Sequence, residues 1–262
     1  MKKISIAAMA AITLLGTTAP VFGSVNASAA STKTIKKGTL TVGLEGTYAP
    51  FSYRKDGKLT GYDVQVAKAV AKKLGLKVKY VQTKWDSLIA GLDANRYDVV
   101  FNNVGKTAER AKAYTFSKPY MYSHTVMILP SDSKLKTLKD IKGKAFAQST
   151  SSNFGQIAKK AGATIISVPG FTEAASLIES GRAEGTLNDL GAYQIWRDEN
   201  KDAKVKSVDM DKYIKPVGSY PLLKKGNTSL QKKINKAITQ LKKDGTLKKL
   251  SEKFFKADLT SK

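Results

Sequence analysis

Four places in the sequence combine charged or hydroxyl side chains with the ends of predicted strands. Glu45 and Asp189 each end a short apolar strand pattern, and their carboxylates can accept hydrogen bonds from an ammonium group. Arg110 ends KTAER behind a third strand, and one guanidinium can hold a carboxylate through two parallel hydrogen bonds. The run AQSTSSN (147–153) leads into a predicted helix, whose first N–H groups attract an anion. Together these groups supply the charges that a zwitterion requires.

Each of these residues also has an ordinary structural explanation. Glu45 can be a solvated loop carboxylate, Arg110 one of many surface cations, and Asp189 a helix N-cap. Ser151 or Ser152 can likewise cap the helix that follows. Residue type alone leaves both interpretations open at every one of these positions.

Known enzyme chemistries find little support in the sequence. His124 is the only histidine and the chain has no cysteine, so a nucleophile–histidine relay would rest on one residue without a surrounding motif. There is no cluster of metal-ligating residues and no glycine-rich nucleotide motif after the first predicted strand, so we expect neither a metal nor a cofactor. A lyase built on carboxylates stays open, because Glu45, Asp63 and Asp189 are available.

The elements that must position these residues alternate between strand and helix. In the first half, strands are predicted over 38–45, 76–82 and 98–102, and helices over 61–75 and 85–95. In the second half, strands are predicted over 124–130, 143–149, 163–168 and 184–188, and helices over 152–162, 171–181 and 190–200. The tail after 227 is helical, with a break at 244–246. This alternation indicates parallel sheets covered by helices, and its two sets predict two small α/β lobes.

Residues 1–30 have the pattern of a secretory signal peptide. Two lysines precede an apolar run, Ile4 to Leu15, and small residues at 27–29 provide a cleavage site. The apolar run is too short to span a bilayer. Without cysteine there is neither a disulfide nor an attachment point for a lipid anchor. We therefore expect a secreted protein that begins near Ser31 and is not a lipoprotein.

The chain is strongly basic. It has 45 Lys and Arg against 21 Asp and Glu, a net charge of +24, and loss of residues 1–30 lowers this to +22 because only two lysines and no acidic residue are removed. Such an excess attracts polyanions. For an exported chain we expect the partner to be an anionic cell-wall polymer rather than nucleic acid, so that charge retains the protein at the cell surface.

Longer motifs resemble the family 3 bacterial extracellular solute-binding proteins, the amino acid receptors of ABC importers. Four stretches are similar: GYDVQVAKAVAKKL (61–74), RYDVVFNNVGKTAERAKAYTFSKPY (96–120), GRAEGTLND (181–189) and DGTLKKLSEKFF (244–255). Gln65 departs from the acidic residue that is usual at its position. EGTYAPF together with TKWDSLIAGLDANRYDVV most resembles the cystine-binding branch. The basic composition resembles cell-surface cystine-binding proteins, some of which are collagen or mucus adhesins.

The resemblance implies an α/β, two-lobed periplasmic-binding-protein type II fold. Each lobe is a sheet flanked by helices, and two crossover strands join the lobes and allow them to close over a ligand as a hinge. Lobe one would comprise 31–122 plus 220–262, and lobe two 123–219.

The resemblance also implies a ligand-binding site. Its residues are Glu45, Tyr48, Phe51, Trp85, Asn103, Gly105, Arg110, Ser152 and Asp189. By this resemblance Arg110 clamps the α-carboxylate, and Asp189 takes the α-ammonium with the carbonyl of Asn103. The N–H groups of Gly105 and Ser152 assist Arg110, although Gly105 replaces a hydroxyl residue that is usual there, and Ser151-Ser152 replaces a usual Gly-Thr.

The remaining assignments concern the rest of the ligand. Tyr48 and Trp85 would cover its aliphatic part, and Glu45 would face its distal end. The expected function is therefore that of an extracellular receptor that captures an amino acid, with cystine first, and delivers it to the membrane permease of an ABC importer. Two alternatives stay open: a charge-retained adhesin that binds collagen or mucin, and a general receptor for polar amino acids.

Overall fold

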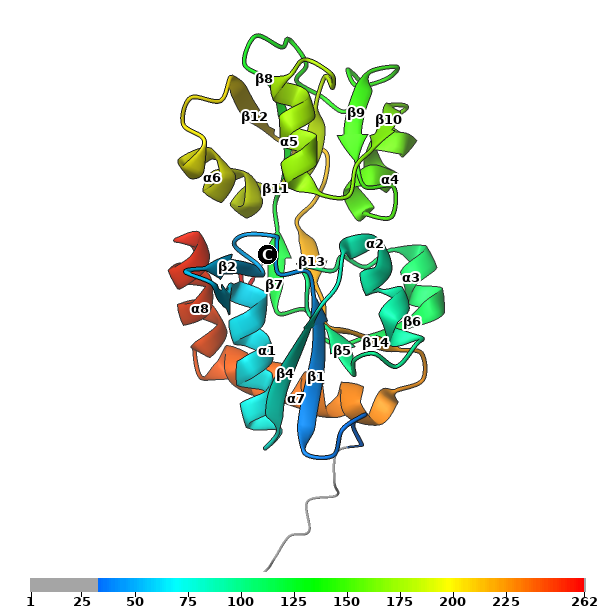
Figure 1. Ribbon diagram of the computed structural model, residues 1–262, viewed down its shortest axis with the longest axis vertical. Helices are drawn as coiled ribbons and strands as arrows, with labels where there is room; N and C mark the ends of the chain where they lie inside the picture. The colour runs from blue at the N-terminus through cyan, green and yellow to red at the C-terminus, as the bar shows by residue number, and fades with distance from the viewer. Residues whose placement is uncertain (1–32, 262) are drawn as a thin grey trace, which may run out of the picture. The chain divides into compact units, whose positions relative to one another are not determined.

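The first sheet is built around a strand that is buried on both faces. In the computed structural model, which describes residues 33–261, all six residues of β1 (Thr39–Leu44) are buried. The sheet has five strands in the order β4-β1-β5-β14-β6 (Figure 1). The other four are β4 (Lys77–Gln82), β5 (Val99–Val100), β6 (Tyr114–Phe116) and β14 (Leu222–Lys224). The expected signal peptide, 1–30, lies outside the described residues.

The expectation of a parallel sheet is correct for part of this sheet only. Strands β4 and β5 run parallel to β1, as the strand–helix alternation predicts. Strand β14 pairs antiparallel with both β5 and β6. The reason is topological, since β14 belongs to the returning chain and enters the sheet from the opposite end.

Helices cover this sheet, and three of them pack on one another. They are α1 (Tyr62–Lys73), α7 (Thr228–Lys243) and α8 (Thr246–Phe255). Their apolar residues, among them Val66, Ile234 and Leu247, share one core with the sheet. Three shorter pieces belong to the same lobe: α2 (Trp85–Leu88), the 3₁₀ turn η1 (Ala90–Leu92) and α3 (Ala108–Ala113). The helix predicted over 85–95 is thus two short pieces. At Gly91 the side chain of Tyr97 packs so closely that a Cβ would lie 2.0 Å from its hydroxyl oxygen.

A hairpin that we did not predict follows the first strand. It consists of β2 (Tyr53–Lys55) and β3 (Lys58–Thr60), joined by Asp56 and Gly57. Both turn residues have positive φ, 50° and 72°, which an Asp-Gly pair adopts readily in a two-residue hairpin turn.

The second lobe contains two small sheets. One is antiparallel, in the order β11-β8-β12, and the other pairs two parallel strands. The strands are β8 (Thr125–Pro130), β9 (Ala145–Gln148), β10 (Thr164–Ser167), β11 (Thr186–Asp189) and β12 (Val205–Asp209). The helices are α4 (Asn153–Lys160), α5 (Phe171–Glu179) and α6 (Leu190–Glu199). A core separate from that of the first lobe includes Ile128, Ala147 and Ile178.

Two antiparallel strands connect the lobes (Figure 1). The chain leaves lobe one through β7 (Met121–Ser123) and returns through β13 (Val217–Ser219). The C-terminal tail adds a third segment, because Tyr122 N donates to the carbonyl of Leu259 at 2.8 Å. The two-lobed architecture with two crossover strands is therefore confirmed. None of the helices described between residues 33 and 261 has the length and apolar character of a membrane span.

Candidate functional site

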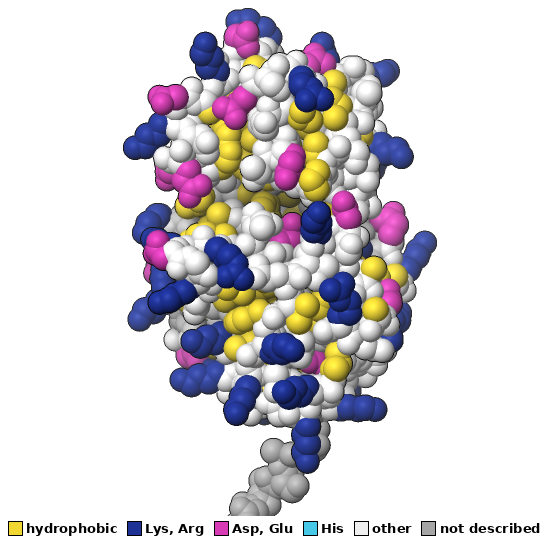
Figure 2. Space-filling view, viewed as in Figure 1, with side chains coloured by type: hydrophobic (Ala, Val, Ile, Leu, Met, Phe, Trp, Pro, Cys, Tyr) yellow, Lys and Arg dark blue, Asp and Glu magenta, His cyan; other side chains and the backbone are white. Residues whose placement is uncertain are grey.

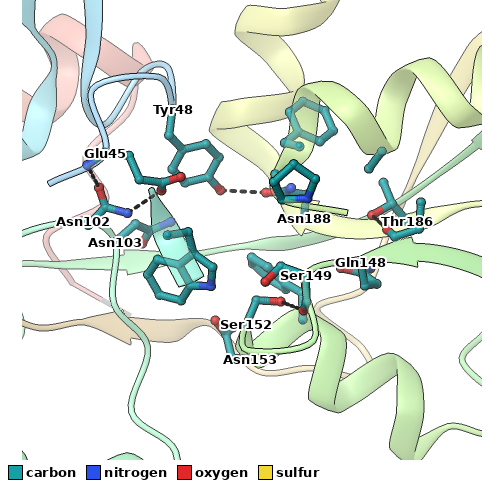
Figure 3. A pocket seen from close by; sticks show the side chains of 17 residues that line it. Glu45, Tyr48, Asn102, Asn103, Gln148, Ser149, Ser152, Asn153, Thr186 and Asn188 are labelled. Atoms are coloured by element: carbon teal, nitrogen blue, oxygen red, sulfur yellow. Dashed lines mark hydrogen bonds between the residues drawn. The ribbon is translucent and has the colours of Figure 1, made fainter. Parts of the chain in front are cut away.

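A pocket lies between the two lobes (Figure 3). About 580 Å³ of space free of atoms, part of it open to solvent, lies between its walls. One wall comes from lobe one: Glu45, Tyr48, Trp85, Asn102 and Asn103. The other comes from lobe two: Ala147, Gln148, Ser149, Ser152, Asn153, Phe154, Pro169, Gly170, Phe171, Ala174, Thr186 and Asn188.

Five of the nine predicted site residues line this pocket: Glu45, Tyr48, Trp85, Asn103 and Ser152. The other four do not. Phe51 is fully buried in the core behind Tyr48, with the two ring centroids 5.0 Å apart. Its side chain supports Tyr48 instead of facing the pocket.

Tyr48 connects the two walls. Its hydroxyl donates to Oδ1 of Asn188 at 2.6 Å, so a side chain of lobe one is bonded to one of lobe two (Figure 3). The Tyr48 ring stacks on Phe51, which in turn packs on Phe255 of α8. The position of this hydroxyl is therefore fixed by the core of lobe one.

Glu45 is the carboxylate of the pocket wall. Asn102 fixes it in two ways: Asn102 Nδ2 donates to Glu45 Oε2 at 2.6 Å, and Glu45 N donates to Asn102 Oδ1 at 2.9 Å. Burial raises the pKa of Glu45 to about 7, the bond from Asn102 opposes this, and the charges of Asp86 and Glu173 raise it further. A ligand cation beside Glu45 would favour its charged form.

Asp63 lies under the pocket floor. Its Oδ2 accepts from the backbone N–H of Asn103 at 2.8 Å, and its Oδ1 accepts from the Tyr120 hydroxyl at 2.7 Å. Burial raises the pKa of Asp63 to about 7, against the effect of these two bonds. Asn103 has φ of 48°, and its N–H points down to Asp63. The carboxylate thus positions a pocket residue without entering the pocket.

Arg110 stands behind the pocket wall, where its guanidinium joins the lobes. Nη1 donates to the carbonyl of Gly105 at 2.8 Å, and Nη2 donates to the carbonyl of Ser151 in lobe two at 2.7 Å. Its Cζ lies 5.1 Å from the centre of the Trp85 ring. Burial lowers the pKa of Arg110 to about 10. Two of its five N–H groups donate to these two carbonyls.

Asp189 is an N-cap in the structure, as its ordinary explanation predicts. Oδ1 accepts from the N–H groups of Gly191 and Ala192 at the start of α6, and Oδ2 accepts from the Ser123 hydroxyl. Burial raises the pKa of this carboxyl, and the bond from Ser123 opposes the increase. The neighbouring Asn188, which we did not predict, faces the pocket in its place.

The serine-rich turn before α4 also contacts lobe one. Asp86 Oδ1 accepts from the hydroxyls of Ser151 at 2.7 Å and Ser149 at 3.1 Å. Ser152 caps α4 by accepting from Gly155 N at 2.9 Å, which its simpler explanation predicts, and it lines the pocket as well. The turn therefore serves as a helix cap, a pocket wall and a contact between lobes.

Trp85 contributes a hydrogen-bond donor that no protein group uses. Its buried Nε1 has no hydrogen-bond partner within residues 33–261, and the side chain lines the pocket. A buried donor without a partner costs about 1–3 kcal/mol, so a ligand acceptor at this point would be stabilising. Among residues 33–261, no group of three or more His, Cys, Asp or Glu side chains could hold a metal ion.

Known proteins resemble this chain along most of its length. The L-cystine-binding protein TcyA of Bacillus subtilis is 44% identical, over 86% of this chain and 84% of its own. The L-cystine solute receptor of Neisseria gonorrhoeae, solved in an unliganded open conformation, is 49% identical, with a TM-score of 0.59, over 86% of this chain and 96% of its own. An ancestral arginine-binding protein bound to arginine is 35% identical, with a TM-score of 0.77, over 84% of this chain and 99% of its own.

Sequence identity and structural similarity rank these two solved structures in opposite orders. The open receptor is more similar in sequence but less similar in structure than the ligand-bound protein. Sequence divergence cannot produce that order, whereas a different angle between two lobes can. The order agrees with the hydrogen bonds of Tyr48, Asp86 and Arg110, which join the two lobes of this chain.

Residues 40–257 match the family of bacterial extracellular solute-binding proteins, family 3. The match covers both lobes and the pocket between them. The family is one of binding proteins, which removes the lyase alternative, and the chain belongs to it.

Proposed function

We propose that this chain is the receptor of an amino acid ABC importer and that cystine is its ligand. Two relatives with 44% and 49% identity bear that ligand in their names. The pocket agrees with it chemically, because Glu45 and Trp85 both line the space between the lobes, and among the described residues the buried Nε1 of Trp85 has no hydrogen-bond partner. That pairing of an acceptor and a donor is the observation that carries the proposal.

Cystine has an ammonium and a carboxylate at each end, so it needs two sets of partners. For one end we propose Arg110, Gly105 and Ser152 on the carboxylate. Asp189 and the carbonyl of Asn103 take the ammonium of that end. Arg110 donates two of its five N–H groups to backbone carbonyls, and Asp189 accepts three of the roughly four hydrogen bonds that a carboxylate can accept.

For the other end we propose Glu45 on the second ammonium and Trp85 Nε1 on the second carboxylate. Tyr48 and the Trp85 ring cover the sulfur-containing middle. The walls also supply neutral polar groups in Gln148 and Ser149.

Isothermal titration of the exported protein with cystine, arginine and serine tests this function. We expect cystine to bind tightest, and a concentration a hundred times its dissociation constant to stabilise the fold by about 2.7 kcal/mol. Equal affinity for serine would favour a general receptor for polar amino acids. Binding of none of the three would contradict the proposal.

A second role follows from the charge. We propose that the +22 charge of the mature chain retains it at the cell surface on an anionic cell-wall polymer, because the chain has no cysteine for a lipid anchor. Electrostatic attraction reaches about 8 Å at physiological salt and about 3 Å at 1 M. A molar salt wash of intact cells should therefore release the protein without detergent. Release that needs detergent would contradict retention, and salt-resistant binding to collagen or mucin would favour the adhesin alternative.

A further inference from the structure

The basic residues are unevenly distributed between the lobes. Helices α1, α7 and α8 of lobe one carry eleven lysines and two acidic residues, and one of the two, Asp63, is buried. Helices α4, α5 and α6 of lobe two carry three cationic and four acidic residues. On the face in Figure 2, the lobe with α1 and β4 shows many dark blue side chains and few magenta ones, whereas both colours mix on the other lobe. The charge excess therefore lies mainly on lobe one.

The lysines of these three helices are arranged in stripes. Each helix presents an exposed i,i+4 pair: Lys68 and Lys72 on α1, Lys232 and Lys236 on α7, and Lys249 and Lys253 on α8. The members of each pair are about 6 Å apart along the helix axis. Like charges at this spacing destabilise a helix by about 0.2–0.5 kcal/mol for each pair. The folding of lobe one therefore does not explain the pattern.

Acidic neighbours do not neutralise the stripes. Asp244, at the end of α7, pairs with Lys73 at 2.8 Å. Glu252 and Asp258 both lie 3.9 Å from Lys248. None of these three carboxylates has a salt bridge to a lysine of the stripes among the described residues.

The side-chain types on this surface restrict its partner. The three helices contain no arginine, so the planar, two-pronged recognition of carboxylates or phosphates is absent from them. Their aromatic residues, Tyr62, Phe254 and Phe255, are buried or half-buried in the core and cannot stack on nucleic acid bases. Protein interfaces favour aromatic residues and arginine over lysine, so a folded partner fits poorly. Lysines that act as point charges suit a flexible chain of phosphates.

We propose that the surface formed by α1, α7 and α8 docks a flexible linear polymer with phosphodiester groups, of the kind that an exported protein meets in a cell wall. The proposal rests on the cell-surface retention proposed above. It names the surface of the protein that is retained and the chemical class of the polymer that retains it. No residue of these helices lines the ligand pocket. Polymer docking on their exposed lysines therefore leaves amino acid capture unchanged.

The test uses linear inorganic polyphosphate as a probe at 50 mM and 500 mM salt. One variant carries Lys68→Gln, Lys72→Gln, Lys232→Gln and Lys236→Gln. Its matched control carries Lys139→Gln, Lys159→Gln, Lys160→Gln and Lys201→Gln, four exposed lysines of lobe two. The net charge changes equally in both.

We expect the first variant to bind polyphosphate at least tenfold more weakly at 50 mM salt, and the control to lose less than threefold. The slope of log affinity against log salt should fall by about two to three in the first variant, at roughly 0.7 for each lost phosphate contact. Equal losses in both variants would mean that the net charge acts as a whole and would overturn the proposal. Tighter binding to poly(dT), to anionic vesicles or to collagen than to polyphosphate would overturn the assignment of the partner.

Cystine titration of the same variants separates this proposal from the proposed receptor function. Both variants should keep the cystine affinity of the unmodified protein within twofold, with and without polyphosphate. If the unmodified protein binds polyphosphate but not cystine, the receptor function fails and the docking surface stands.

Discussion

The hydroxyl of Tyr48 lies 2.6 Å from Oδ1 of Asn188, and this hydrogen bond crosses the pocket from one lobe to the other. Asn188 Oδ1 also accepts from the backbone N–H of Asp189 at 2.7 Å. Asn188 Oδ1 therefore accepts one hydrogen bond from Tyr48 of lobe one and one from the end of β11, the strand that holds Asp189.

Substitution of Tyr48 by Phe should weaken the closed state. The ring keeps its stacking on Phe51, and only the bond between lobes is lost, which typically costs about 0.5–1.5 kcal/mol. We expect bound amino acid to dissociate roughly 2- to 12-fold faster, measured by stopped-flow fluorescence. Tyr53→Phe, in the hairpin outside the pocket, is the control and should leave the rate unchanged. Equal rates in Y48F and the unmodified protein would refute a role for this bond.

Asp86→Ala should have a related effect at the other contact between lobes. It removes the acceptor for the hydroxyls of Ser149 and Ser151. Because this contact is partly exposed, we take about 1–2 kcal/mol for the two bonds, which predicts a 5- to 30-fold loss of ligand affinity. Asp93→Ala, which removes a bond to Tyr114 within lobe one, is the matched control. Small-angle scattering of the ligand-free D86A protein should show a more open average form, and an unchanged curve with unchanged affinity would contradict the prediction.

The ionisation of Glu45 should make the free energy of unfolding depend on pH. Its pKa is about 7 in the folded protein and about 4.5 as its ordinary value, so between these the folded state holds a proton that the unfolded state lacks. The free energy of unfolding should therefore fall as pH rises from about 4.5 to 7. Glu45→Gln removes this share of the slope, whereas the share of Asp63, whose pKa is also raised to about 7, remains. Denaturant titrations at pH 5, 6, 7 and 8 that give parallel curves for both proteins would show the interpretation to be wrong.

The same carboxyl makes a prediction for binding. A ligand ammonium beside Glu45 favours the ionised form, so capture should release a proton near pH 6. Calorimetry in buffers of different ionisation enthalpy measures this release. We expect it to be smaller in E45Q, where only Asp189, whose pKa burial also raises, remains to release a proton to a ligand ammonium.

Arg110→Lys keeps the positive charge but loses the planar fork. A single ammonium cannot donate as Arg110 does to the carbonyls of Gly105 and Ser151 while it also holds a ligand carboxylate. We expect affinity to fall by about 2–5 kcal/mol, the usual cost of breaking a buried charge pair. Arg96→Lys, an exposed arginine of the same lobe, is the control. Calorimetry that finds unmodified affinity in R110K, with an intact circular dichroism spectrum, would remove Arg110 from the proposed site.

Export makes a prediction that mass spectrometry can check. If residues 1–30 are a signal peptide, the secreted protein should begin at Ala30 or Ser31 and carry no lipid. An intact mass that retains Met1, or an added acyl chain, would contradict this.

Long periodic elements could be predicted from the sequence, and short ones could not. The apolar spacing of α1 and α7 predicts both helices within about two residues of their ends. Strands β6, β13 and β14 have three residues each, which is too few for any periodicity to show. Their pairing, and with it the antiparallel part of the first sheet, depends on contacts between distant segments.

The residues that line the pocket could likewise be predicted only in part. Strand ends could be predicted as its location, but adjacent residues of a strand point to opposite sides. Asn188 faces the pocket while Asp189 turns to cap α6, and only the register of β11 on β8 decides between the two. Gln148, which ends β9, and Ser149, which follows it, were missed because neither residue type is distinctive.

The tail that ends on the crossover strands has a practical consequence for sensor design. Leu259 is bonded to Tyr122, in the middle of β7, so the C-terminal tail sits at the pivot between the lobes. A point on a pivot moves least when two bodies rotate about it. The signal of a fluorescent reporter joined to this tail would therefore change little when the lobes close on a ligand. The exposed turn at Gly181, after α5 in lobe two, is a better attachment point for one dye of a distance-reporting pair.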